Sequence, residues 1–204
     1  MLKVALTGGI ATGKTYVLRR LRHLEVATID ADDLVHEALR AGTPATAAIT
    51  AQFGDHVLEP DGAVNRKVLA ARVFGDPEAR RILEGILHPP TYLAIQRWFA
   101  GLDAAHVPLG VAAIPLLFET GHEADFDAIV VTACDPDEQV RRVVVRDGTT
   151  EAEARQRLAA QMPVNEKVRR ADFVIWTRDT LQDTYAQVDA VWIALKERAA
   201  RPRP

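Results

Sequence analysis

The sequence predicts an α/β fold in which a five-stranded parallel sheet carries helices on both faces. Five short runs are rich in apolar and β-branched residues, and such near-continuous apolarity is typical of parallel strands that are covered on both faces. Helical patterns alternate with these runs, as a doubly wound sheet requires. A glycine-rich turn joins the first run to the first helical stretch. The expected strands are residues 3–7, 26–30, 107–114, 127–133 and 172–176.

Three helices are expected to pack against this sheet. Residues 14–24 form the first, directly after the glycine-rich turn. Asp135 can cap the second, which has Pro136 at its first position and runs to about Arg146. Residues 181–199 carry apolar side chains at helical spacing and should close the fold, and residues 201–204 are expected to fray.

Two insertions interrupt the simple alternation of strands and helices. About 75 residues separate the second and third expected strands, far more than one crossover needs. This insertion should be a helical subdomain over residues 32–104, in which glycine, proline and aspartate mark the turns. Its expected helices are residues 32–40, 44–53, 64–74, 77–87 and 91–101. The second insertion, residues 141–170, is rich in arginine, and residues 1–31, 105–140 and 171–204 remain as the core.

Composition excludes several classes of protein. A chain of 204 residues can build one ample core, and its 48% hydrophobic and 26% charged content argues against disorder. A net charge of −3 gives no global electrostatic reason to expect nucleic acid or a membrane as partner. The single cysteine, Cys134, excludes an internal disulfide framework, and no two of the six histidines are three or four residues apart. The chain has five lysines against 20 arginines, so each lysine merits attention.

We expect a cytoplasmic protein. The N-terminal apolar run is short and is followed by two glycines, which does not fit a signal peptide. No stretch approaches the roughly 18 apolar residues of a membrane span.

The strongest motif is the glycine-rich turn, Gly8-Gly9-Ile10-Ala11-Thr12-Gly13-Lys14-Thr15. It matches the G-x-x-x-x-G-K-S/T pattern of a phosphate-binding P-loop between a strand and a helix. Glycines let the backbone N–H groups point inward as an anion nest, and the helix adds its positive end. Lys14 should reach the β- and γ-phosphates, and the Thr15 hydroxyl should bind Mg²⁺. A simple glycine turn that caps a helix would not require Lys-Thr at these positions.

Acidic residues follow the second expected strand. Asp30, Asp32 and Asp33 stand at its carboxyl end, where open α/β sheets bind ligands. A carboxylate there can accept a proton from a substrate hydroxyl or help to position Mg²⁺. One of them could instead cap the following helix. Three aspartates allow both roles, and we expect Asp32, in preference to Asp30, to be the catalytic group.

Arginines are concentrated in the second insertion. Arg142 and Arg146 are four residues apart on one helix face, and Arg155 and Arg157 follow. Guanidinium groups match phosphate oxygens and neutralise charge in phosphoryl transfer. The alternative is a solvated basic face that Glu151 and its neighbours balance. Because a P-loop precedes them, we expect a lid that closes over ATP.

In this order, the sequence blocks resemble the dephospho-CoA kinase family. The chain opens with LTGGIATGKT and IDADDLVHEAL, and continues with DGAVNRKVLAARVFGDPEARRILEGILHPP and VAAIPLLFETG. VRRVVVRDGTTEAEARQRLAAQ and ADFVIW follow, so the resemblance covers about residues 3–176. Many NTPases share the P-loop, whereas the combination of GGI, IDAD, LHP and PLLFE is much more specific.

The resemblance implies an enzyme that transfers the γ-phosphoryl of ATP to the ribose 3′-hydroxyl of dephospho-CoA, the last step of coenzyme A synthesis. It implies ATP and Mg²⁺ at the site, dephospho-CoA as acceptor, and no nucleic-acid or membrane partner, and it leaves protein partners open. The helical insertion would bind the acceptor. The implied ATP-binding residues are Gly8, Gly9, Ile10, Ala11, Thr12, Gly13, Lys14, Thr15, Tyr16, Arg142, Arg146 and Gln161.

The same resemblance implies roles on the acceptor side. Asp32, the last acid of IDAD, would be the general base, with Asp30 beside it. Arg66 and His88 match positions that face the acceptor, although His88 could instead cap a helix before Pro89. Glu119, at the end of PLLFE, would lie near the acceptor. Lys14, Asp32 and Arg146 are thus the expected catalytic residues.

The chain departs from the family pattern at three places. Ala11-Thr12 stands where the family usually has Gly-Ser, so Ala11 should adopt a backbone conformation that suits a residue other than glycine. Trp176 and the three residues after it replace an asparagine followed by a small residue, which leaves the adenine contact there in doubt. Pro163 follows Gln161 closely and is expected to end the lid helix.

Three other functions are weaker alternatives. A different small-molecule P-loop kinase would lack a reason for the long helical insertion and the PLLFE block. A GTP-driven switch generally shows an N/T-K-x-D stretch, which this sequence does not contain. A structural protein with a P-loop would bind nucleotide without turnover.

Overall fold

The computed structural model describes residues 1–73 and 75–201 of the chain. The chain divides into two compact units, Met1–Ile29 with Phe99–Pro204, and Asp30–Trp98. Two expectations reach beyond the described residues: the last residue of the helix expected over 64–74, and the fraying expected after residue 201. Each unit has its own hydrophobic cluster.

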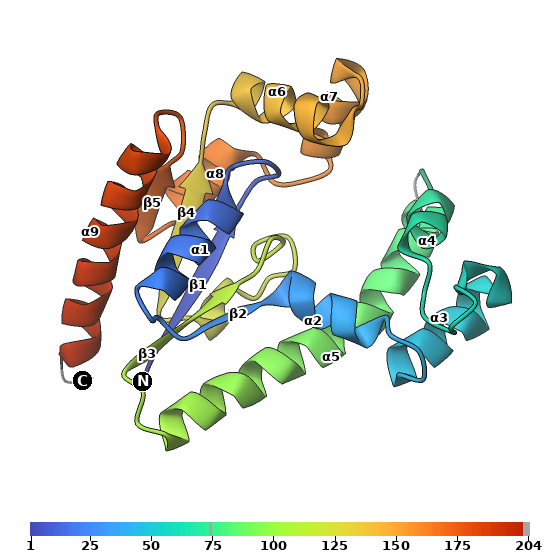
Figure 1. Ribbon diagram of the computed structural model, residues 1–204, viewed down its shortest axis with the longest axis horizontal. Helices are drawn as coiled ribbons and strands as arrows, with labels where there is room; N and C mark the ends of the chain where they lie inside the picture. Colours follow the sequence, from blue (N-terminus) through green and yellow to red (C-terminus); the bar gives the residue numbers. More distant parts are fainter. Residues whose placement is uncertain (74, 202–204) are drawn as a thin grey trace. The chain divides into compact units, whose positions relative to one another are not determined.

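The first unit is organised around one parallel sheet, as expected from the five apolar runs (Figure 1). The strand order is β2-β3-β1-β4-β5, so β1 lies at the centre. Ala5 of β1 is in register with Ala112 on one side and Ile129 on the other. Because the strands are parallel, the carboxyl end of β1 opens at the middle of one sheet edge. The strands are β1 Leu2–Gly8, β2 Thr28–Asp30, β3 Leu109–Ala113, β4 Ala128–Ala133 and β5 Phe173–Trp176.

Two amphipathic helices cover one face of the sheet. Helix α1, Lys14–His23, buries Val17, Leu18 and Leu21, and helix α9, Leu181–Ala200, buries Val188 and Leu195. These side chains belong to one cluster with alternate residues of β1, β3 and β4. Helix α8, Val164–Arg169, packs against β4 (Figure 1). The burial of these apolar side chains is the main source of stability for the unit.

The second unit is helical, and the sequence shows why α2 and α3 start where they do. Thr43 caps α3, Pro44–Phe53, with Pro44 at the first position, and Asp30 caps α2, Ala31–Ala38. A short 3₁₀ helix, Asp55–Val57, and α4, Arg66–Val73, follow. The core of this unit is a cluster of buried hydrophobic residues: Leu39, Ile49, Phe53, Val57, Val64, Leu69, Ala79 and Leu87.

The prediction of two helices over residues 77–87 and 91–101 is wrong. One helix, α5, runs over Pro77–Ala104 and contains Pro89 and Pro90. Each proline removes one N–H from the helical ladder, which normally ends or kinks a helix. The Thr91 hydroxyl donates to the Leu87 carbonyl at 2.7 Å, so this carbonyl has a donor within the interrupted turn. Tyr92, Ile95 and Phe99 are buried at helical spacing beyond the prolines, and this packing overrides the local preference.

Helices α6 and α7 and a 3₁₀ turn complete the description of the first unit. Helix α6 spans Pro136–Asp147, as expected, and α7 spans Glu151–Ala159 after a capping box between Thr150 and Glu153. A 3₁₀ turn occupies Glu123–Asp125. The prediction that Pro163 ends the lid helix is wrong. Helix α7 already ends at Ala159, and Pro163 stands at the N-cap of α8. The expected lid boundary at residue 141 falls inside α6.

Across residues 1–73 and 75–201, no helix combines the length and the apolar character needed to cross a membrane.

Candidate nucleotide and phosphoryl-transfer site

The P-loop connects the carboxyl end of the central strand to the first helix. β1 ends at Gly8 and α1 begins at Lys14, with Gly13 at the N-cap in a left-handed conformation of φ 83°. Within the described part of the chain, no side chain caps this helix start, and its first turn holds no acidic residue. The first N–H groups of a helix carry partial positive charge. This helix start is therefore suited to bind an anion such as phosphate.

The glycines of the P-loop are explained by close neighbours within the protein. A Cβ on Gly8 would lie 2.1 Å from the Thr132 hydroxyl oxygen. A Cβ on Gly9 would lie 2.6 Å from the side-chain amide nitrogen of Gln139. Gly13 needs its left-handed φ and also lies against Thr177. The loop is thus packed tightly from behind, which fixes its path.

Ala11 corrects one expectation. Its φ is 58°, which lies in the left-handed region that glycine prefers, whereas the sequence suggested an ordinary conformation. A left-handed residue with a Cβ costs on the order of 1 kcal/mol. Ala11 packs against the cluster of Val140, Val143 and Ala154 on α6 and α7, and this packing offsets the cost. The backbone geometry of the loop is therefore kept without glycine at this position.

Threonine hydroxyls hold the loop from the sheet side. Thr12 is almost fully buried, and its hydroxyl donates to the Gly9 carbonyl at 2.7 Å and lies 2.7 Å from the Thr132 hydroxyl oxygen. The Thr177 hydroxyl donates to the Thr12 carbonyl at 2.8 Å. Thr12 and Thr177 are two of the places where the chain departs from the family pattern. Both substituted residues thus support the P-loop backbone.

Helix α6 holds the loop from the other side through two donors. Gln139 Nε2 donates to the Ile10 carbonyl at 2.7 Å, and Arg142 Nη1 donates to the Ala11 carbonyl at 3.3 Å. Gln139 is buried, with 4% of its surface exposed. The sequence analysis did not identify Gln139. Its position three residues before Arg142, on the same helix face, was the available signal.

Arg142 is partly buried and is hydrogen-bonded on the P-loop side of the molecule. Its Nε donates to Glu138 at 2.7 Å, its Nη1 to the Thr177 hydroxyl at 3.0 Å, and its Nη2 to the Thr177 carbonyl. Hydrogen bonds from Arg141 and Arg142, with that from Arg141 the larger cause, lower the pKa of Glu138 to about 2. The carboxylate therefore stays charged and keeps Arg142 oriented.

Arg146 belongs to a different network. Its Nε and Nη2 donate to Asp147 at 2.7 Å and 3.0 Å, and Arg157 Nη1 donates to the same carboxylate at 2.7 Å. The hydrogen bond from Arg146 is the main cause that lowers the pKa of Asp147. Arg146 is half exposed, with 56% of its side chain accessible. The two arginines share a helix, but the structure does not bring them together on one partner.

Gln161 lies in the turn after α7 and contacts the loop directly. Its Oε1 accepts a hydrogen bond from the Ile10 N–H at 2.9 Å. The residue was expected at the ATP site, and the structure places it against the P-loop backbone. The Ile10 residue is thus held by Gln161 at its N–H and by Gln139 at its carbonyl.

Glu119 forms an ion pair with a buried lysine that sequence reasoning did not identify. Lys167 of α8 is fully buried, and its Nζ lies 2.8 Å from Glu119 Oε1 and donates to the Pro115 carbonyl at 3.2 Å. Glu119 also accepts from the Met162 N–H at 2.9 Å. A buried ammonium requires such partners. The scarcity of lysine in the chain was the only signal for Lys167.

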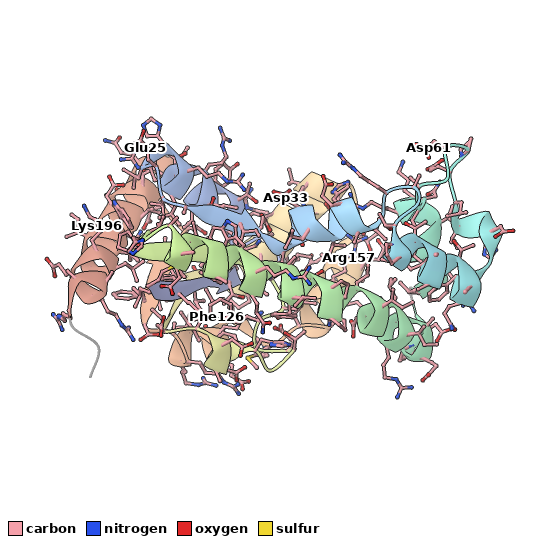
Figure 2. All side chains as sticks on the ribbon, turned by 90° about the horizontal axis from the view of Figure 1, so that it is seen from below. Glu25, Asp33, Asp61, Phe126, Arg157 and Lys196 are labelled. Carbon is pink, nitrogen blue, oxygen red and sulfur yellow. The ribbon has the colours of Figure 1, made fainter. Side chains whose placement is uncertain are left out.

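The second unit carries the remaining candidate site residues, those expected on the acceptor side. Asp30 Oδ1 accepts from the Asp32 N–H at 3.1 Å and so caps α2. Asp32 is exposed on the first turn of α2, beside the labelled Asp33 (Figure 2). Arg66 Nη1 lies 2.9 Å from His36 Nε2. His88 does not cap a helix before Pro89, because α5 continues through this position, and the residue is half-buried within the helix.

Metal-ligating side chains do not form a dedicated cluster in the part of the chain that the structure describes. Mg²⁺ in kinases is usually held by one or two protein oxygens together with substrate phosphates. Thr15 is exposed in the first turn of α1 and offers a hydroxyl oxygen of this kind. The donor set at the P-loop therefore fits Mg²⁺ that arrives with ATP.

Comparisons with known proteins agree with this geometry. A family model described as dephospho-CoA kinase matches residues 2–183. The dephospho-CoA kinase of Anaeromyxobacter dehalogenans is 51% identical over 175 residues, which is 86% of this chain and 83% of that protein. The structure of TT1252 from Thermus thermophilus has a TM-score of 0.79 at 32% identity and covers 95% of this chain and 97% of its own. A dephospho-CoA kinase from Campylobacter jejuni, 24% identical with a TM-score of 0.65 over 95% of this chain and 96% of that one, supports the fold.

Proposed function

The chain belongs to the dephospho-CoA kinase family, and from this premise we propose how its own residues carry out the reaction. The protein is a kinase that uses ATP to phosphorylate dephospho-CoA, giving CoA and ADP in coenzyme A biosynthesis. The structural observation that carries this function is the P-loop at the carboxyl end of the central strand, followed by a helix whose first turn holds no acidic residue.

The P-loop binds the phosphates of ATP in this proposal. The N–H groups at the start of α1 and the Lys14 ammonium supply positive charge where the γ-phosphoryl develops negative charge in the transition state. Lys14 is half-buried at the first position of α1. Tyr16 follows on the same turn, half exposed, and completes the ATP-binding segment.

Mg²⁺ is the proposed metal of the reaction. The Thr15 hydroxyl would hold it, and the metal would neutralise charge on the phosphate oxygens of ATP when bound. Thr15 stands next to Lys14, so both side chains leave the same helix turn. The protein needs no further metal ligands if the phosphates and water fill the remaining positions.

Asp32 is the proposed general base. Its carboxylate accepts the proton of the acceptor 3′-hydroxyl as the oxygen attacks the γ-phosphoryl. Asp30 has a separate task, since its Oδ1 binds the Asp32 N–H and caps α2. Asp30 thus holds the backbone of Asp32 in place at the exposed first turn of α2.

The second unit is proposed to bind the acceptor, with Arg66 and His88 as contacts. Arg66 is exposed at the first position of α4, and a guanidinium there can bind an acceptor phosphate. Glu119 was predicted near the acceptor as well. Its hydrogen bonds to Lys167 and to Met162 support a structural task, so we assign it the weaker part in acceptor binding.

Arg146 is the proposed charge-neutralising group of the lid, residues 141–170. It is exposed and donates to the neighbouring Asp147, so a modest side-chain movement can release it toward phosphate. Arg142, in contrast, already holds the P-loop backbone. We further propose that the enzyme works in the cytoplasm, where the buried thiol of Cys134 stays reduced.

The test is an ADP-release assay with ATP and a panel of acceptors. Dephospho-CoA should give rapid ADP formation, while nucleoside monophosphates and adenosine should stay near the background of ATP alone. Faster ADP release with a nucleoside monophosphate than with dephospho-CoA would assign the protein to another small-molecule kinase. Nucleotide binding without turnover on any acceptor would make it a binding protein.

A further inference from the structure

We propose that Gln139 is a positioning residue for ATP: it turns the peptide between Ile10 and Ala11 so that the Ala11 N–H faces the phosphates. Gln139 Nε2 donates to the Ile10 carbonyl at 2.7 Å from within α6. In a trans peptide the carbonyl and the next N–H point in opposite directions. Holding the Ile10 carbonyl toward α6 therefore directs the Ala11 N–H away from α6. The inference rests on the proposed binding of ATP at the P-loop.

The neighbouring peptides are held in the same way. Arg142 donates to the Ala11 carbonyl, and Thr177 donates to the Thr12 carbonyl. Three consecutive carbonyls, those of Ile10, Ala11 and Thr12, thus each accept a hydrogen bond from a side chain outside the loop. In each of these trans peptides the N–H points away from the carbonyl. The Thr12 N–H closes a turn to the Gly9 carbonyl at 3.2 Å, and the Ala11 N–H is the group that we assign to the anion nest.

Gly9 gives a second, independent observation. A Cβ on Gly9 would lie 2.6 Å from Gln139 Nε2, closer than real Cβ contacts allow. The side of Gly9 that faces α6 is therefore occupied by the Gln139 amide. Glycine at position 9 leaves room for the Gln139 amide. The amide can therefore reach the Ile10 carbonyl and orient the peptide between Ile10 and Ala11.

A purely structural role for Gln139 makes a different prediction, and Gln187 provides the matched comparison. Gln187 Oε1 accepts from the Trp176 N–H, and its Nε2 donates to the Trp176 carbonyl, both at 2.9 Å. Gln187 is a partly buried glutamine that binds main-chain groups outside the P-loop. Replacing either glutamine removes side-chain hydrogen bonds to the main chain, but only Gln139 orients an N–H of the anion nest.

The experiment compares Gln139→Met and Gln187→Met in the full chain. Methionine keeps the length and volume of glutamine and removes the donor. The dissociation constant of ADP is measured by calorimetry, and the KM values for ATP and dephospho-CoA and the melting temperature are measured alongside. For Gln139→Met we expect the ADP dissociation constant and the ATP KM to rise about tenfold, the effect of one misaligned hydrogen bond to a charged group. The KM for dephospho-CoA should change less than twofold.

Gln187→Met should lower the melting temperature about as much as Gln139→Met does. It should leave ADP affinity within twofold of the wild type. An unchanged ADP affinity in Gln139→Met, or a loss no larger than in Gln187→Met, overturns the proposal. ADP binding needs no acceptor, so a negative result here leaves the phosphorylation of dephospho-CoA intact.

Gly9→Ala keeps the proposal testable if Gln139→Met does not fold. Its Cβ displaces the Gln139 amide, so it should weaken ADP binding through the same contact. Gly9→Ala combined with Gln139→Ala removes both the contact and the crowding, and the double variant should bind ADP no more weakly than the worse single variant. Losses that multiply in the double variant contradict the proposal, because they show that the two residues act separately.

Discussion

Lys167 Nζ lies 2.8 Å from Glu119 Oε1, and this pair joins α8 to the segment that follows β3. Lys167 is fully buried, whereas the Glu119 side chain keeps 20% of its surface accessible. The two residues are 48 positions apart in the sequence. Because Glu119 also binds the Met162 N–H, the pair fixes the chain just before α8, where the expected lid returns to the core.

The unequal burial of this pair predicts unequal costs of breaking it. Glu119→Gln leaves a buried ammonium without its countercharge, so it should lower the free energy of unfolding by about 3–5 kcal/mol. Lys167→Met leaves the partly solvated Glu119 and should cost less, about 1–3 kcal/mol. Urea unfolding of both variants and of the double variant measures this order. A larger loss in Lys167→Met than in Glu119→Gln would show that the carboxylate, not the ammonium, is the group that depends on the pair.

Asp32 and Asp30 should respond differently to the same substitution. Asp32→Asn preserves shape but cannot accept the proton, so it should lower kcat by about 10²–10⁴-fold with little effect on ATP binding. Asp30→Asn should cost far less, since asparagine caps a helix as well as aspartate does and can still accept from the Asp32 N–H. Steady-state kinetics and ADP calorimetry separate the two effects. The reverse order of the two kcat values would make Asp30 the base.

Arg146 is expected to act in turnover, with Arg157 as its matched control. Both guanidinium groups bind Asp147 in the structure. Arg146→Ala should lower kcat by about 10²-fold or more through the loss of charge neutralisation and should leave the KM for dephospho-CoA little changed. Arg157→Ala removes the other partner of Asp147 and should keep most of the activity. Equal losses in both variants would indicate that the Asp147 network, and not the Arg146 charge on phosphate, is what matters.

The lowered pKa of Glu138 predicts that the stability of the protein depends on pH. Hydrogen bonds from Arg141 and Arg142 lower its pKa from 4.5 to about 2 in the folded protein. The folded state thus favours the carboxylate, and its contribution to stability is complete above about pH 4.5 and is lost as the pH falls toward 2. The stability difference between the wild type and Glu138→Gln, measured by urea unfolding, should shrink over this interval.

Glu197→Gln on the exposed side of α9 controls for the removal of one negative charge. A stability difference between wild type and Glu138→Gln that stays constant from pH 5 to pH 2 would contradict the assignment of this ion pair.

Local patterns predicted the elements that depend on local information. The apolar runs identified all five strands, because parallel strands buried on both faces need uninterrupted apolar side chains. The P-loop was evident because its lysine and glycines have fixed spacing. The same local reasoning predicted a break at Pro89 and Pro90 that the packing of Tyr92, Ile95 and Phe99 overrides.

The support of the P-loop by Gln139 and Thr177 could not be predicted, because it consists of contacts between distant segments. Gln139 and Thr177 reach the P-loop from positions more than 100 residues away in the chain. The left-handed conformation of Ala11 likewise depends on packing against α6 and α7. Motif residues such as Lys14 and Thr15 were identified by type and spacing, whereas Gln139 and Thr177, which hold the loop around them, belong to no motif that the sequence analysis used.

Transfer of labelled phosphoryl tests the central claim most directly. The protein is incubated with dephospho-CoA and ATP that carries ¹⁸O in its γ-phosphoryl, and the products are examined by mass spectrometry and ³¹P NMR. The account predicts a labelled phosphoryl group on the ribose 3′-oxygen of the acceptor, together with unlabelled ADP. The Lys14→Ala variant, which should fold normally and lose at least about 10²-fold in turnover, should give almost no labelled product. Label that appears only in inorganic phosphate, or equally in the Lys14→Ala reaction, would contradict the account.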